Sequence, residues 1–129
     1  MTDSPWPRRP SALVAEDEES DRDIVVQSLE DEGFDITTAR TGREALDVIA
    51  GRRFDVLVLD ILLPYLDGFD VMKQLRTVDP GLLGRTVVVS RLATEELKLF
   101  FPISKVFTKP VDPQALGTAA RELADGLRD

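Results

Sequence analysis

Residues 54–60, with the sequence Phe-Asp-Val-Leu-Val-Leu-Asp, constrain the fold more than any other segment of the chain. Residues 56–59 are all apolar and lack the alternation of polar and apolar side chains that a half-exposed strand shows. An unbroken apolar strand is typical of a parallel sheet whose two faces are both covered by helices. The sequence therefore predicts a strand buried on both sides, within a fold of alternating strands and helices.

Shorter segments of the same kind recur along the chain and alternate with segments that have apolar residues at helical spacing. The pattern predicts an α/β protein with five parallel strands, right-handed crossovers and helices on both faces of the sheet. The expected strands span 12–15, 34–38, 54–60, 86–90 and 105–108, and the expected helices span 20–33, 41–51, 69–78, 93–100 and 114–127.

Capping residues mark where several of these helices should begin. Ser20 with Asp23, and Thr41 with Glu44, have the spacing of a capping box, in which two residues satisfy each other's backbone N–H groups. Asp67 precedes a glycine and a helical pattern, so we expect it to cap a helix and not to take part in catalysis.

Composition limits both the number of domains and the available chemistry. A chain of 129 residues, 43% apolar and 31% charged, has the size and mixture of one globular domain. It contains no cysteine and no histidine, which excludes disulfides, thiolate or imidazole catalysis, and zinc sites built on either residue. With 16 basic and 24 acidic residues the formal net charge is −8, which argues against direct nucleic-acid binding because that requires a basic face.

The N-terminal segment and the hydropathy pattern bear on location. No apolar run approaches the roughly 18 residues of a membrane span, and the first residues lack the apolar core of a signal peptide. Three prolines within residues 1–10 predict an irregular tail, followed by one domain over residues 11–129. We therefore expect a cytoplasmic protein with no membrane insertion.

Polar side chains follow four of the expected strands, at the edge of a parallel sheet where ligands bind. Alone, each is an ordinary strand-end residue, so their combination carries the prediction. Crowded carboxylates repel one another, and Mg²⁺, which prefers oxygen ligands, relieves that repulsion. A carboxylate beside such an ion and a lysine can attack a phosphoryl group and form an acyl phosphate. The residues are Glu16, Asp17, Asp60, Ser90 and Lys109.

The same residues give the chain, from about residue 11 to residue 127, a resemblance to the receiver domain of bacterial two-component response regulators. This resemblance implies the doubly wound (βα)5, flavodoxin-like fold with strand order 2-1-3-4-5. It rests on four motifs that stand in the family's order: the acidic pair Glu16-Asp17, the phosphorylation loop 60–68, the hydroxyl residue Ser90, and Lys109-Pro110.

The resemblance implies a role for each residue of the site. Asp60 would accept the phosphoryl group, and Lys109 would pair with that group or with Asp60 before transfer. Asp17 and Asp60 would bind Mg²⁺ directly, Glu16 would act mainly through water, and the backbone carbonyl of Leu62 would complete the protein ligands.

The chain departs from the family pattern after the fourth expected strand. Ser90 would be the hydroxyl that moves toward the phosphoryl group, but Arg91 follows it where a small residue is usual. Its guanidinium could reach the phosphoryl group, block bulky donors or point to solvent. The stretch up to Lys109 is shorter than usual by about one helical turn, so we expect a short or irregular fourth helix. Val106 stands at a position that is often aromatic.

Leu62 and Leu92 lie two residues beyond Asp60 and Ser90, at positions that tune the access of water in the family. Neither side chain can orient a water molecule by hydrogen bonding. We therefore expect a long-lived phosphoryl state, which a half-life of seconds would contradict.

Together these features predict a stand-alone, phosphorylation-dependent signalling module and not an enzyme, beyond Mg²⁺-dependent self-phosphorylation and autodephosphorylation. The expected partners are a sensor histidine kinase or phosphotransfer protein and a downstream protein target, and a homodimer is possible. The main alternative is a degenerate receiver that binds proteins without phosphorylation. An aspartate-based phosphohydrolase would need an acid where Leu62 stands, and a flavin protein would need a phosphate-cradling loop where Glu16 and Asp17 stand.

Overall fold

The computed structural model describes residues 9–92 and 94–127. The expected Pro-rich tail lies outside the described residues, apart from Arg9 and Pro10. Pro10 is buried, and its carbonyl accepts a hydrogen bond from Asp35 N at 2.8 Å, so the chain joins the sheet at this residue. In the described part of the chain no helix has the length and apolar character that crossing a bilayer requires.

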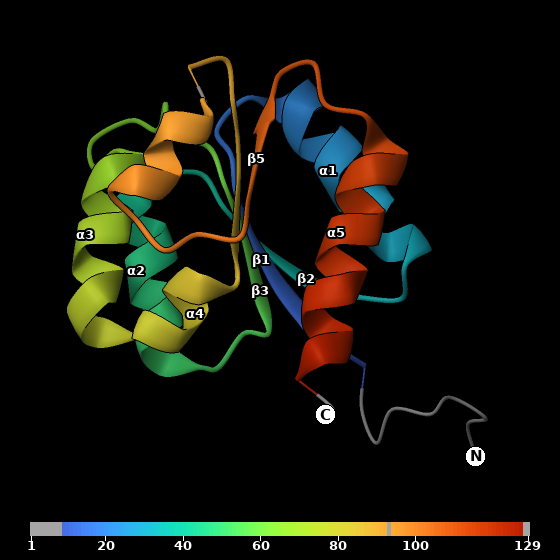
Figure 1. Ribbon diagram of the computed structural model, residues 1–129, viewed down its shortest axis with the longest axis horizontal. Coiled ribbons are helices and arrows are strands. Elements are labelled where there is room, and N and C mark those ends of the chain that lie inside the picture. The colour runs from blue at the N-terminus through green and yellow to red at the C-terminus, as the bar shows by residue number, and fades with distance from the viewer. Residues whose placement is uncertain (1–8, 93, 128–129) are drawn as a thin grey trace.

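A single parallel sheet of five strands forms the centre of the molecule (Figure 1). Its strand order, β2-β1-β3-β4-β5, is the order that the resemblance implied. The central strand β3 is buried along its whole length, which confirms the prediction made from its unbroken apolar sequence. The strands are β1 (Ser11–Ala15), β2 (Asp35–Ala39), β3 (Val56–Leu59), β4 (Thr86–Ser90) and β5 (Lys105–Thr108).

Helices cover both faces of this sheet, as Figure 1 shows: α1 and α5 pack on one face, and α2, α3 and α4 pack on the other. The expected strands and helices agree with the observed ones to within two residues at each end. The helices are α1 (Glu19–Asp31), α2 (Gly42–Gly51), α3 (Gly68–Val78), α4 (Pro80–Gly84), the 3-10 helix η1 (Glu95–Leu99) and α5 (Pro113–Gly126).

The two layers of the core meet at the sheet, because successive side chains of a strand point to opposite faces. On β1, Leu13 and Ala15 pack into the layer under α2 and α3, while Ala12 and Val14 pack into the layer under α1 and α5. This alternation fixes which face each residue after the strand can approach.

The predicted caps were partly right. Asp67 caps α3 and forms a capping box with Asp70, and Thr41 Oγ1 accepts a hydrogen bond from Glu44 N at 3.0 Å. The predicted Ser20–Asp23 box was wrong, because α1 begins earlier and its N-cap is Glu18. The longer side chain of Glu18 reaches the free backbone N–H groups of the first turn, which makes Ser20 a residue inside the helix.

The helix α4 was missed. No helix was expected between residues 78 and 86, and Asp79 does end α3. Asp79 also caps a new helix, since its side chain accepts a hydrogen bond from Leu82 N at 3.0 Å and Pro80 occupies the first turn. A helix of five residues is too short to show periodicity, so only the caps could have indicated it.

The short or irregular fourth helix is confirmed, since η1 is a five-residue 3-10 helix. It lies beside α3 (the orange turn in Figure 1), and a side chain of α3 holds the residues that follow it. The guanidinium of Arg76 donates a hydrogen bond to the carbonyl of Phe100 and stacks 4.5 Å from the ring centroid of Phe101.

Candidate functional site

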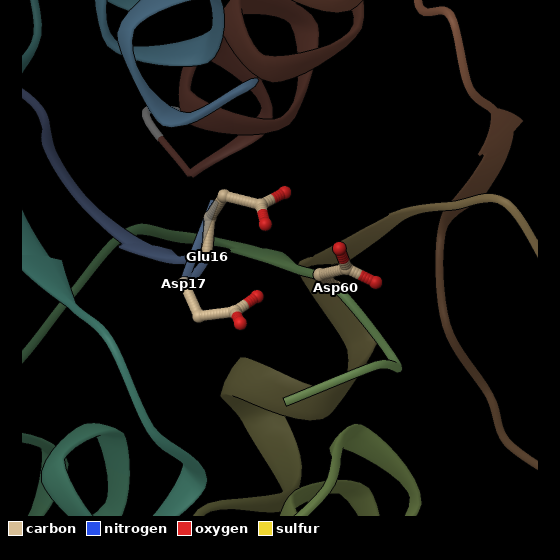
Figure 2. A group of neighbouring side chains, drawn as sticks. All are labelled: Glu16, Asp17 and Asp60. Carbon is tan, nitrogen blue, oxygen red and sulfur yellow. The ribbon is translucent and has the colours of Figure 1, made fainter. Parts of the chain in front are cut away.

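The carboxyl ends of β1 and β3 bring three carboxylates together. Glu16 and Asp17 follow β1, and Asp60 follows the neighbouring strand β3. Figure 2 shows the three side chains beside one another where the two strands end, and one oxygen from each lies within 4.8 Å of the others. The sequence predicted this group correctly, because neighbouring parallel strands end at the same edge of the sheet.

Sheet hydrogen bonds hold two of these residues directly. Glu16 N donates to Ala39 O on β2 at 3.0 Å, and Asp60 N donates to Ala15 O on β1 at 3.0 Å. Glu16 and Asp60 are buried, with 3% and 4% of their surface exposed, whereas Asp17 is exposed. The cluster therefore has two fixed, buried carboxylates and one that is open to solvent.

Lys109, at the end of β5, is brought to this cluster as predicted. Its Nζ donates hydrogen bonds to Asp60 Oδ2 at 2.7 Å, to Glu16 Oε1 at 2.7 Å and to Asp21 Oδ2 at 2.8 Å. An ammonium group has three N–H donors, so these bonds use all of them. The peptide bond between Lys109 and Pro110 is cis.

Asp21 is the member of this group that sequence reasoning missed. It lies in the first turn of α1 and does not directly follow a strand. The strand-end pattern that identified the other residues therefore could not indicate it. Its position depends on how α1 packs against α5 and β1, which is a tertiary feature that the sequence pattern does not specify.

Backbone and arginine contacts complete the geometry. The other oxygen of Asp60, Oδ1, accepts a hydrogen bond from Leu62 N at 2.9 Å, and Glu16 Oε2 accepts one from Glu18 N at 3.1 Å. Arg22, buried in α1, donates to the carbonyl of Glu16 at 3.1 Å and so holds the loop after β1. It is a second structural contributor that the sequence did not reveal.

The charges in this site perturb one another. Burial, together with the negative charge of Asp60, raises the pKa of Glu16 to about 7, although the hydrogen bond from Lys109 opposes the shift. Burial alone would lower the pKa of Lys109, but its hydrogen bonds to Asp21, Asp60 and Glu16 raise that pKa above its ordinary value. Four carboxyl groups thus surround a single ammonium group, and the lysine does not neutralise all of their negative charge.

The donor set fits a hard divalent cation. Three carboxylates with oxygens this close supply the all-oxygen, anionic environment that Mg²⁺ prefers, and exposed Asp17 leaves the cluster open to solvent for the waters that Mg²⁺ retains. The predicted carbonyl ligand, Leu62, contributes its amide to Asp60 in this structure, and the role of its carbonyl stays a prediction.

Ser90 and its neighbours lie beside this cluster in the sheet but are not bonded to its side chains. Ser90 is fully buried at the end of β4, and its hydroxyl accepts a hydrogen bond from Leu92 N at 3.4 Å. Its carbonyl accepts a hydrogen bond from Lys109 N at 3.2 Å, which links it to the start of the Lys-Pro segment. Arg91 and Leu92 are exposed, and the Leu62 side chain is 46% exposed.

The loop that carries Asp60 depends on two glycines for close backbone approach. A Cβ at Gly68 would lie 2.7 Å from the carbonyl oxygen of Asp60, and a Cβ at Gly42 would lie 1.9 Å from the carbonyl oxygen of Leu66. Neither distance is compatible with a side chain. Glycine at these positions therefore lets α3 and α2 pack directly against the loop.

The fold and site define a doubly wound α/β domain with a carboxylate cluster at the carboxyl edge of its sheet, and comparison with known proteins gives its family. A sequence model described as the response regulator receiver domain matches residues 12–121. The chain belongs to this family, the receiver domains of two-component response regulators.

Individual relatives support the assignment. Response regulator MprA of Mycolicibacterium vanbaalenii is 43% identical over 70 residues, which cover 54% of this chain and 30% of that protein. The receiver domain of Francisella response regulator 1452 has 30% identity and a TM-score of 0.82, covering 92% of this chain and 98% of the other. A CheY-like receiver domain protein from Methanospirillum hungatei has 26% identity and a TM-score of 0.83, with coverages of 94% and 98%.

Proposed function

We propose that this receiver domain is a phosphorylation-dependent signalling module that accepts a phosphoryl group on Asp60 with the help of Mg²⁺. The observation that carries the proposal is the pairing of Asp60 Oδ2 with Lys109 Nζ at 2.7 Å, within a cluster that also contains Glu16 and Asp17. A buried carboxylate beside a fixed ammonium and two further acids is suited to receiving a phosphoryl group in the presence of a divalent cation.

In the proposed reaction a carboxylate oxygen of Asp60 attacks the phosphorus in line with the bond to the donor. A new O–P bond forms as the bond to the donor's nitrogen or oxygen breaks, and the leaving group departs with that electron pair. Lys109 donates hydrogen bonds to phosphoryl oxygens, and Mg²⁺, when bound, supplies further neutralisation of their charge. Asp60 is the acceptor, so the domain is not an enzyme with turnover on an external substrate.

The proposed setting follows from the family. The donor is a phosphohistidine of a sensor kinase or of a phosphotransfer protein, the location is the cytoplasm, and phosphorylation changes binding to a downstream protein. Between β4 and β5 this chain has a 3-10 helix of five residues, η1, followed by Phe100, whose carbonyl is hydrogen-bonded to Arg76 of α3, and we expect this segment to contribute to recognition of a partner specific to this chain.

The first experiment is intact mass spectrometry after incubation with Mg²⁺ and acetyl phosphate, a small donor that needs no kinase. We expect one added phosphoryl group on the wild type and none on Asp60→Asn or in the presence of EDTA. Asp67→Asn is the matched control, because Asp67 is an acid of the same loop that only caps α3, and it should accept the group as the wild type does.

Two outcomes contradict the proposal in different ways. An adduct that persists in Asp60→Asn would place the acceptor elsewhere. Absence of both the adduct and Mg²⁺ binding would favour an interaction module that works without phosphorylation. If the adduct forms, its decay after removal of the donor tests the long-lived state expected from Leu62 and Leu92, and loss within seconds would refute it.

A further inference from the structure

The ammonium group of Lys109 is shared among three carboxylates, and only two of them belong to the metal cluster. The third, Asp21, lies 2.8 Å from Lys109 Nζ and is not among the carboxylates whose oxygens come within reach of a common ion. Nothing in the proposed reaction requires it. Asp21 therefore has a defined contact in the site without an assigned role.

The contact is built into the first turn of α1. The carboxylate of Glu18 accepts hydrogen bonds from Asp21 N at 2.7 Å and from Ser20 N at 3.2 Å, which fixes the backbone of this turn. The side chain of Asp21 is 23% exposed to solvent, whereas the side chain of Lys109 is 8% exposed. Asp21 is thus a fixed carboxylate at the rim of the site, facing the buried ammonium.

We propose that Asp21 is a positioning residue that acts through Lys109 and sets the balance between cation and phosphoryl binding at Asp60. The proposal rests on the proposed function, because it concerns the same site. By pairing with Lys109, Asp21 offsets the positive charge that would repel a nearby Mg²⁺ ion. It also occupies one of the three N–H donors and adds a negative charge where a phosphoryl group would have to be accommodated.

The charge of Asp21 should favour cation binding and disfavour anion binding at Asp60. These opposite effects distinguish a role in electrostatics from a role in maintaining the shape of the site. Removing the charge of Asp21 weakens cation binding, since Lys109 is then less neutralised. The same change strengthens binding of an anion on Asp60, since one repulsive charge is lost and Lys109 has a donor released. A variant that merely distorted the site would bind both ions less well.

The test compares Asp21→Asn with Asp23→Asn. Both changes remove one negative charge from α1, but Asp23 is exposed and is not a partner of Lys109, so it controls for the overall change of charge. Mg²⁺ affinity is measured by calorimetry. The affinity for beryllofluoride, an anion that mimics a phosphoryl group on aspartate, is then measured at saturating Mg²⁺, and circular dichroism checks that each variant is folded.

For Asp21→Asn we expect Mg²⁺ affinity to fall and beryllofluoride affinity to rise, each by about three- to tenfold, as one charge a few ångströms away requires. For Asp23→Asn we expect both affinities to stay within about twofold of the wild type, because exposed charges are screened. Equal changes in the two variants, or changes of the same sign for both ions in Asp21→Asn, would overturn the proposal.

Failure of the proposed function has a different signature. If the wild type itself binds neither beryllofluoride nor a phosphoryl group, the acceptor role of Asp60 is wrong, and the role of Asp21 is overturned with it. If the wild type binds both and only the comparison of variants shows no difference, the acceptor role stands and Asp21 alone is excluded.

Discussion

Glu16 is a buried carboxyl group whose pKa is set by burial and by the charged groups around it. It is 3% exposed, faces the charge of Asp60, and receives one hydrogen bond from Lys109. Without a metal ion, burial and this neighbouring charge raise its pKa to about 7, from an ordinary value of 4.5. The folded, metal-free protein therefore retains a proton at a pH where the unfolded chain has lost it.

This retained proton predicts how stability varies with pH in EDTA. The contribution of Glu16 is full below pH 4.5 and is lost as pH rises toward 7, the direction that a raised carboxyl pKa requires. Between pH 5 and pH 8, the free energy of unfolding of the wild type should fall by about 2 kcal/mol more than that of Glu16→Gln. Urea unfolding at both pH values measures this difference, and parallel slopes for the two proteins would refute it.

At the scale of residues, the sequence predicted the carboxylate cluster and Lys109 but not Asp21 or Arg22. The former follow strands, and parallel strands of one sheet place the residues that follow them at a common edge. Asp21 and Arg22 lie on α1, and their approach to the site depends on the start of that helix and on its packing. The expected start of this helix differs from the observed one by a single residue, so the sequence left the packing of α1 undetermined and not its position in the chain.

At the scale of elements, α2 contains a matched pair of glycines with opposite surroundings. A Cβ at Gly42, in the first turn, would lie 1.9 Å from the carbonyl oxygen of Leu66, whereas a Cβ at Gly51, in the last turn, would meet nothing within 4 Å beyond its own helix backbone and chain neighbours. One end of the helix thus depends on direct contact with the loop after β3, and the other does not.

Alanine substitutions test this difference. Gly42→Ala should destabilise the protein by about 2 kcal/mol or more, because the backbone of α2 or of the loop must move to admit the methyl group. Gly51→Ala should be neutral or stabilising by up to about 1 kcal/mol, since alanine favours helix. Thermal unfolding of the two variants measures both effects, and equal losses of stability would show that the contact with Leu66 is not a constraint.

The element between β4 and β5 was predicted only in part. The number of residues between Ser90 and Lys109 limits the length of a helix there, and that limit could be derived from the sequence. The attachment of η1 to α3 could not, because it depends on Arg76 and Phe101, which are far apart in the chain and form a cation–π pair only once both elements are placed.

At the scale of the whole molecule, a net charge of −8 and a cluster of carboxylates at one edge of the sheet oppose folding when no cation is present. The strand order could be given in advance because the family resemblance supplied it. The alternation pattern alone predicts a parallel doubly wound sheet but not the positions of its strands.

Coupling between metal binding and folding follows from this charge distribution. Mg²⁺ at about a hundred times its dissociation constant should raise the free energy of unfolding by about 2.7 kcal/mol, because only the folded chain assembles the cluster. Asp17→Asn should lose most of this increase while folding normally without metal, since Asp17 is exposed. Differential scanning calorimetry with and without Mg²⁺ measures the effect. An equal response in the variant would mean that the ion binds elsewhere.

The hydrogen bonds that join Glu16 to β2 and Asp60 to β1 extend the sheet into the site itself. The backbone that carries these two buried carboxylates is therefore held by the same kind of hydrogen bond as the strands, and we expect their backbone positions to change little when a group binds. The loop after Asp60, the turn after Ser90 and η1 lie outside the sheet and are held by side-chain and loop contacts instead of by sheet hydrogen bonds. If Asp60 accepts a phosphoryl group as proposed, we expect the backbone at the strand ends to stay in place, and any change that a partner detects to arise in the loops around the site.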